Sequence, residues 1–130
     1  MTLTPITITF ASNGQPVLNP DGGFASGALV FTLCSSAGDP ITIEDSTTGE
    51  TVLPTPIVAS VYQGQLLHLP VGGGPYTPFT LIANDDPTTT PTGTFYLVHE
   101  QLLAGNVPDW PFTVHHAASG GTQTIASQRP

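Results

Sequence analysis

Residues 73–130 read GGPYTPFTLIANDDPTTTPTGTFYLVHEQLLAGNVPDWPFTVHHAASGGTQTIASQRP. Side chains recur at a spacing of two: Phe79, Leu81 and Ala83 form one set, residues 95, 97 and 99 alternate with 96 and 98, and short stretches follow at 111–115 and 122–126. Alternation with a period of two is typical of strands with one buried face. The stretch therefore predicts strand, turn, strand, long connection, strand, turn, strand.

The N-terminal half has the same pattern. Pro54 and Pro56 interrupt residues 52–56 and exclude a central strand there. Residues 99–105 end in Gly, which allows at most a short helical turn. We predict an all-β chain, a single β-sandwich domain over residues 1–130, with about eight or nine short strands. The remaining strands are expected at 3–10, 29–33, 41–43, 57–61 and 66–69, with turns at 12–16, 19–23, 37–40 and 62–65.

Charge is distributed very unevenly. Nine residues are acidic, Arg129 is the single Lys or Arg, and the formal net charge is −8. Binding to nucleic acid depends on Lys and Arg that displace counterions from phosphates, and docking on anionic lipid needs them too. We therefore expect neither nucleic acid nor a membrane as a partner.

Cys34 is the single cysteine, so an intramolecular disulfide is excluded. It lies in the apolar run ALVFTLC, and we expect it in the core as a small hydrophobic residue. The chain begins MTLTPITITF, without the basic segment and long apolar stretch of a signal peptide or transmembrane helix. We expect it to be made in a host cytoplasm and not exported by a standard route.

Four histidines raise the question of a metal site. His115 and His116 are adjacent, and on a strand adjacent side chains point to opposite faces. A site could form from His99, Glu100 and one of this pair only if their strands are neighbours. We expect ordinary strand or loop histidines and no bound metal.

Catalytic and calcium signatures are weak. No pattern brings together two of Glu44, Glu50 and Glu100, as a glycosidase would require. Asp85-Asp86 lacks EF-hand spacing, and Asp before Pro typically begins a turn, because its side chain accepts hydrogen bonds from the backbone that bends there. With neither a nucleophile elbow nor a phosphate loop, we expect a non-enzymatic protein without a cofactor.

Aromatic side chains offer a different kind of site. Trp110 with Tyr62, Tyr76 and Tyr96 is a candidate platform for stacking of sugar rings. Alternatively, Trp110 packs beside Phe112, because prolines on both sides of it in PDWPF hold the backbone in a corner. A carbohydrate-binding module that aids host adsorption is therefore the second functional hypothesis.

Several segments, taken in order, carry a resemblance. Five of these segments lie over about residues 50–130: PTPIVASVYQGQLLHLPV, NDDP…TPTG, TFYLVHEQL, PFTVHHA and SGGTQTIASQRP. A sixth segment, SNGQPV…GALVFTL, precedes them in the N-terminal part of the chain. In this order they resemble small β-sandwich domains in minor tail proteins of phages that infect actinobacteria. Such domains are similar to Ig-like or carboxypeptidase-regulatory-like sandwiches.

The resemblance implies a non-enzymatic virion protein. It would be a multicopy subunit on the tail, or a decoration protein on the capsid shell that reinforces contacts between capsomers. It would assemble with itself, commonly as a trimer, and with tail or major capsid proteins. We expect the interface at the N-terminal strand, the Pro-rich connection and the C-terminal tail, including Leu3, Ile6, Pro87, Pro91 and Arg129.

Overall fold

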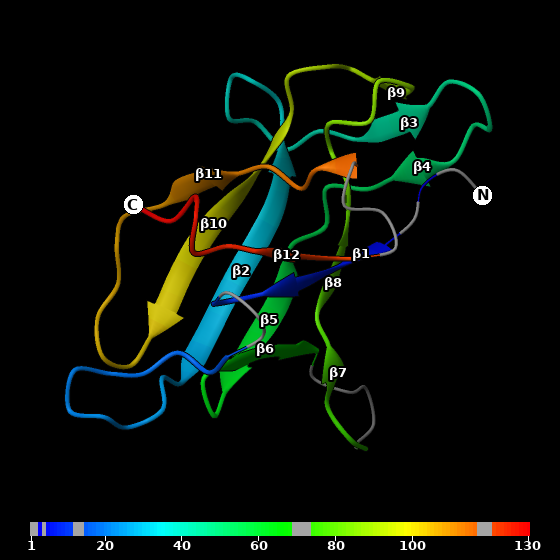
Figure 1. Cartoon of the computed structure of the whole chain (residues 1–130). Helices are drawn as coiled ribbons and strands as arrows, with labels where there is room; N and C mark the ends of the chain where they lie inside the picture. Colours follow the sequence, from blue (N-terminus) through cyan, green and yellow to red (C-terminus); the bar gives the residue numbers. More distant parts are fainter. Residues whose placement is uncertain (1–2, 4, 12–14, 69–73, 117–120) are drawn as a thin grey trace.

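The computed structural model describes residues 3, 5–11, 15–68, 74–116 and 121–130. Within these residues the regular structure consists of strands, arranged in three sheets (Figure 1). The strands are β1 (Pro5–Thr9), β2 (Gly27–Cys34), β3 (Ile43–Asp45), β4 (Thr51–Val52), β5 (Ile57–Tyr62), β6 (Gln65–His68), β7 (Thr77–Pro78), β8 (Thr80–Ile82), β9 (Thr89–Thr90), β10 (Phe95–Leu102), β11 (Trp110–Phe112) and β12 (Thr122–Thr124).

The largest sheet has the strand order β11-β10-β2-β5-β6-β7, with every neighbouring pair antiparallel. Its centre is the long pair of β2 and β10, which runs in register from Gly27 opposite Leu102 to Cys34 opposite Phe95. Leu29, Phe31 and Leu33 of β2 point to the core, as their alternation predicts.

A second sheet, β12-β1-β8, covers one face of the first. Figure 1 shows β12 and β1 crossing in front of β10 and β2. Ile6 and Ile8 of β1 are fully buried and belong to one hydrophobic cluster with Phe31, Phe79 and Phe112. The first and last strands pair in parallel, so both ends of the chain take part in closing the sandwich.

The third sheet, β4-β3-β9, lies at the upper end of the molecule in Figure 1. Its buried Ile43 belongs to the same hydrophobic cluster. The packing of these antiparallel sheets around that cluster confirms the all-β sandwich. The described residues contain twelve strands, more than expected, because the two-residue strands β4, β7 and β9 are too short to show alternation.

Two local predictions can be compared with the structure. Residues 99–105, which we limited to a short helical turn at most, contain no helix: β10 continues to Leu102, because its residues pair with β2 along their whole length. The interruption at Pro54 and Pro56 is confirmed, since β4 ends at Val52 and β5 begins at Ile57.

The hairpin predicted at 62–65 is present between β5 and β6. Gln63 and Gly64 both have positive φ, 50° and 78°, as a two-residue turn of type I′ requires. A Cβ on Gly64 would lie 2.6 Å from the carbonyl oxygen of Val17, so this position needs glycine. Of the turn predicted at 12–16, residues 12–14 lie outside the described residues.

Cys34 is buried, as predicted. Desolvation raises the pKa of its thiol above the ordinary value, so at neutral pH it stays a thiol and packs as an apolar group. In the described ranges no helix has the length and apolarity that crossing a membrane requires.

Candidate functional site

A buried carboxylate is the most polar feature inside the sandwich. Glu100 points inward from β10, and its side chain is 0% exposed. Arg129 Nε and Nη2 donate to its two oxygens at 2.6 and 2.7 Å. Trp110 Nε1 and the amide of Val107 donate to the same carboxylate at 3.0 and 3.1 Å. These bonds supply the charge pairing and the donors that a buried carboxylate needs.

The ion pair with Arg129 outweighs the effect of burial on the pKa of Glu100. Burial alone would raise the pKa of Glu100, but the hydrogen bonds from Arg129, Val107 and Trp110 and the Arg129 charge hold it below its ordinary value. The same pairing raises the pKa of Arg129. The single cation of the chain is therefore neutralised internally. Arg129, which we expected at an interface, is ion-paired within the chain and keeps 27% of its side chain exposed, so its place at an interface stays a prediction.

The C-terminal segment is also held by side-chain amides. Gln128 accepts from the amide of Thr113 at 2.9 Å and donates to its carbonyl at 2.9 Å. Gln123 donates to the same carbonyl at 2.7 Å and accepts from the amide of His115 at 2.9 Å. These two glutamines continue the hydrogen bonding of the backbone beyond β11, so the segment is part of the fold.

His115 and His116 both contact one carboxylate. Their Nδ1 atoms lie 2.8 and 3.1 Å from the Asp85 oxygens, and the His116 amide donates to Asp85 at 2.6 Å. The prediction that they point to opposite faces is wrong, because β11 ends before them and the backbone leaves the strand. Burial opposes the charge on Asp85, but the His116 amide and the two rings lower its pKa below the ordinary value.

The proposed metal ligands are not brought together. His99 lies 2.8 Å from Asp109, whereas Glu100, next to it, points to the other face of β10 and binds Arg129. In the part of the chain that the structure describes, no group of three or more His, Cys, Asp or Glu side chains is placed to hold a metal ion.

The remaining predicted interface residues differ in exposure. Pro87 and Pro91 are exposed, so both are available to a partner. Leu3 and Ile6 are 3% and 0% exposed. The prediction that they form surface contacts is corrected, because both belong to the interior of the sandwich.

The turn expected of Asp before Pro is present at Asp86. Its carboxylate accepts hydrogen bonds from the amide and hydroxyl of Thr88 at 2.9 and 2.8 Å.

The aromatic platform is not formed as predicted. Trp110 is 2% exposed and its ring contacts Phe112 at 5.9 Å between centroids, so the alternative reading of PDWPF holds. Tyr96 is 4% exposed, and burial raises the pKa of its hydroxyl. Tyr62 is exposed and packs against Tyr76, with ring centroids 5.3 Å apart. Of the four predicted platform residues, Tyr62 and Tyr76 are therefore the exposed pair that the structure brings together.

A groove of about 550 Å³ opens between β8 and residues 51–57. The edge of β8 that does not pair with β1 faces this groove, and two side chains form hydrogen bonds with the backbone of that edge. The Thr80 amide donates to His68 Nε2 at 3.2 Å, and the Tyr96 hydroxyl donates to the carbonyl of Ile82 at 2.6 Å. The groove is lined mainly by apolar side chains and has the size of a small ligand site.

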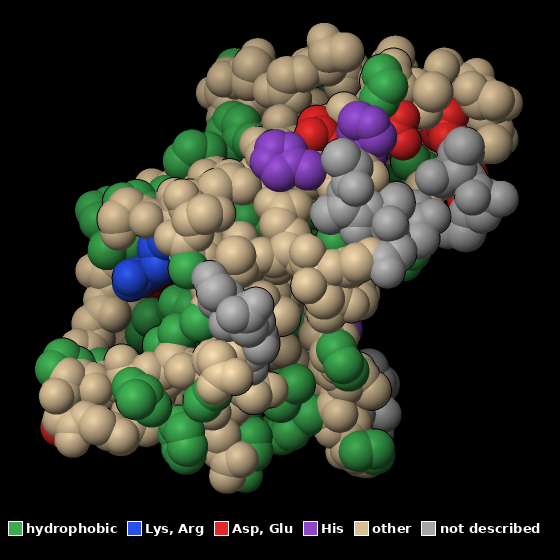
Figure 2. Space-filling model, viewed as in Figure 1, with side chains coloured by type: hydrophobic (Ala, Val, Ile, Leu, Met, Phe, Trp, Pro, Cys, Tyr) green, Lys and Arg blue, Asp and Glu red, His purple; other side chains and the backbone are tan. Residues whose placement is uncertain are grey.

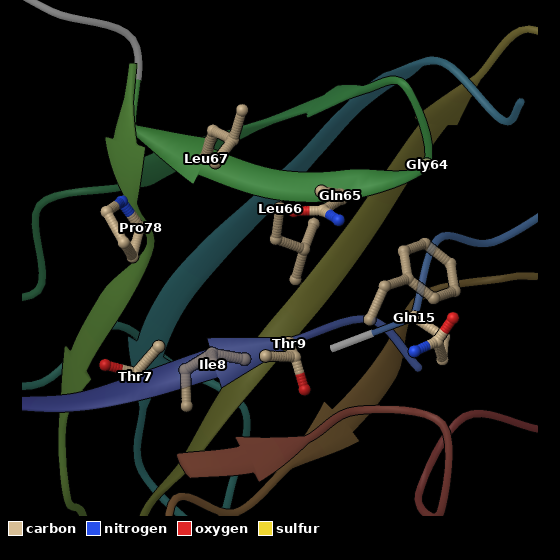
Figure 3. Close-up of a pocket in the computed structure, with 10 residues that line it drawn as sticks. Thr7, Ile8, Thr9, Gln15, Gly64, Gln65, Leu66, Leu67 and Pro78 are labelled. Carbon is tan, nitrogen blue, oxygen red and sulfur yellow. The ribbon is translucent and has the colours of Figure 1, made fainter. Parts of the chain in front are cut away.

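A smaller pocket of about 210 Å³ lies between β1 and β6. Figure 3 shows Thr7, Ile8 and Thr9 along one wall, with Leu66 of β6 pointing toward them. The side chains that line the pocket are apolar or uncharged polar groups. Such walls can bury an apolar group but provide no acid or base.

Several large apolar side chains are exposed. Leu18 and Phe24 face each other across a β-bridge and are 56% and 54% exposed. Leu103, whose amide donates to the carbonyl of Ser26, is 83% exposed. Figure 2 shows apolar side chains along the lower end of the molecule and acidic ones gathered at the upper right, near β3 and β4. On the face seen in Figure 2, most acidic side chains are therefore gathered at one end.

Comparison of the chain with family models, with curated proteins and with solved structures gives no match.

Proposed function

We propose that this chain is a non-enzymatic structural subunit of a tailed-phage virion. It sits in many copies on the tail, as a minor tail protein, or on the outer capsid shell, where it reinforces contacts between capsomers. Its fold in this proposal is an Ig-like sandwich of the carboxypeptidase-regulatory type. Its partners are further copies of itself and the tail or major capsid proteins.

The observation that carries the proposal is the exposed apolar surface on a tightly anchored sandwich. Exposed apolar patches on a soluble domain typically mark contacts with other proteins. Leu18, Phe24 and Leu103 form such a patch at one end. The sandwich behind it is held by a bidentate ion pair and by pairing of its first and last strands, so the patch is carried on a rigid support.

The test is the composition and shape of particles. Virions from a phage with this gene deleted are compared with wild-type virions by electron microscopy and by mass spectrometry of purified particles. We expect the chain in wild-type particles, and an altered tail or missing surface density in the mutant. Wild-type particles that contain no copy of the chain would contradict the proposal.

Carbohydrate binding is the second candidate, and the Tyr62–Tyr76 pair now supports it in place of Trp110. The two rings are 48% and 40% exposed, and exposed tyrosines can stack on sugars. A glycan array with wild type and with Tyr62→Ala tests it. Binding that the substitution abolishes supports the module; no binding by wild type removes it.

A further inference from the structure

One face of the six-stranded sheet carries apolar side chains that no other sheet of the described residues covers. The β12-β1-β8 sheet packs on the inner face, where the buried residues of β2, β5 and β10 point. On the opposite face, the register aligns Val30 of β2 with Val58 of β5 on one side and with His99 of β10 on the other. We call the positions on this side the outer face. They are Ala28, Val30, Thr32, Val58, Ser60, Tyr62, Gln65, Leu67, Leu97, His99, Gln101 and Pro111.

The composition of the outer face is unusual for a surface in contact with water. An antiparallel sheet with one solvated face normally alternates apolar inside with polar outside. In β2 this alternation is missing: Ala28 and Val30 lie on the outer face, and the strand reads GALVFTLC. Val58 of β5 is 53% exposed. An almost continuous apolar run is typical of a strand that is buried on both faces.

The distribution of charge in the chain indicates which kind of partner covers the outer face. The chain carries a net charge of −8, and its single Arg is bound to Glu100. Two copies that meet through acidic surface therefore repel each other. The positions of the outer face include no Asp, Glu, Lys or Arg. The nearest carboxylate along the register, Asp109, lies at the margin beside His99.

We propose that the outer face is the contact between two copies of this chain, related by a twofold axis. A twofold contact uses the same patch on both copies, so the patch must be complementary to itself. A neutral, apolar sheet face meets this condition, and two such faces pack about 10 Å apart, as in a sandwich. A basic partner would instead be drawn to the acidic region near β3 and β4.

The dimensions of the face indicate a weak dimer. Five neighbouring strands spaced about 4.8 Å apart, each contributing about five residues at 3.4 Å, span on the order of 20 by 20 Å. Two copies would bury roughly 800 Å² or somewhat more, which is below the range of stable specific interfaces and falls among weak or transient contacts. The dimer should therefore form at micromolar or higher concentration and be reinforced by the other contacts of an assembly.

The inference rests on the proposed structural role only for its biological setting, because the dimer is measured with the purified chain. Sedimentation from about 10 to about 500 μM, the range where a small interface is partly occupied, should show monomer and dimer for wild type. Introducing two like charges, Val30→Glu with Val58→Glu, should weaken the dimer about tenfold or more.

The matched control places two glutamates on apolar positions outside both the outer face and the patch of Leu18, Phe24 and Leu103, namely Ala37→Glu with Leu53→Glu. Both residues are exposed, and this variant should dimerise within about twofold of wild type. A second pair, Val30→Lys with Val58→Lys, should be monomeric alone and should associate when mixed with the Glu variant. Circular dichroism checks that all variants fold.

If the double variants do not fold, measurements on the wild-type chain alone test the proposed dimer. Concentration-dependent amide shifts in NMR spectra should be confined to the five strands of the outer face, β11, β10, β2, β5 and β6. A wild type that stays monomeric, a trimer, shifts at other positions, or a control variant that loses the dimer as fully as the Glu variant would each overturn the inference. Failure of the dimer leaves incorporation into virions untouched as a separate measurement.

Discussion

Arg129→Ala is the most informative substitution for the stability of this protein. It removes the bidentate partner of Glu100, whose side chain is 0% exposed. The carboxylate keeps hydrogen bonds from Trp110 and Val107 but loses its counter-charge. Breaking a buried pair on one side destabilises by about 3–5 kcal/mol. Arg129 is 27% exposed, so water can approach the vacated site, and we expect about 3 kcal/mol.

The effect should depend on pH with a defined sign. In wild type the pKa of Glu100 is lowered, so the pair stabilises the fold above the unfolded-state pKa, and this contribution is lost as pH falls through the folded-state pKa. Without Arg129, burial raises the pKa of Glu100. In acid, protonation of Glu100 then removes the unpaired buried charge from the variant. The loss in free energy of unfolding relative to wild type should therefore be largest near neutral pH and shrink toward pH about 4.

The assay is urea unfolding followed by the fluorescence of Trp110. This is the single tryptophan of the chain, and its indole donates to Glu100, so it reports on this part of the core. A drop of about 3 kcal/mol is a large fraction of the stability of a domain this size, about 5–15 kcal/mol.

A double variant provides the control. Glu100→Gln combined with Arg129→Ala removes the uncompensated charge, so it should be more stable than Arg129→Ala alone. Glu100→Gln alone should be the milder single change, because the partly exposed guanidinium can reach water. An Arg129→Ala variant within about 0.5 kcal/mol of wild type, or with the same deficit at pH 7 and in acid, would refute the reasoning.

Three further predictions concern other contacts. Tyr96→Phe removes the donor to the carbonyl of Ile82 and should destabilise by about 1–3 kcal/mol in urea unfolding; no change would mean that another donor replaces the hydroxyl. Gly64→Ala places a Cβ against the carbonyl of Val17 at positive φ. We expect a loss of more than about 2 kcal/mol of stability, and an unchanged melting temperature would contradict the turn geometry. Asp85→Asn removes a carboxylate whose pKa is lowered by its hydrogen bonds despite burial. Wild type should lose stability relative to this variant as pH falls below the unfolded-state pKa of about 4, and parallel pH profiles from melting curves would contradict the contact.

Local patterns predicted the strands well because they depend on neighbouring residues. The alternation of Leu29, Phe31 and Leu33 identified the core side of β2, and the hairpin at 62–65 followed from a glycine in a short polar turn between apolar runs. The strand expected at 95–99 was too short, because the segment that follows it ends in Gly105 and allowed a short helical turn. There the ladder with β2, more than sixty positions away, decided the backbone.

The candidate site residues were placed less well. Trp110 was a candidate for a sugar platform, with packing beside Phe112 as the alternative, and the structure buries it. Arg129 was expected at an interface, and the sequence did not indicate that both side chains bind Glu100. Ile6 was expected at a contact and instead belongs to the core. An aromatic ring, a charge near the end of the chain and an alternating first strand each fit a surface as well as an interior, so the chain sequence could not distinguish them.

Period-two alternation, turn residues and charge balance can be read along the chain, because each depends on residues a few positions apart. They yield an all-β domain with an acidic surface and one cation. Which carboxylate receives that cation, and which face of the largest sheet is left uncovered, depend on strands brought together from distant parts of the sequence. Such pairings come from packing the whole core at once, so they exist only in the folded molecule.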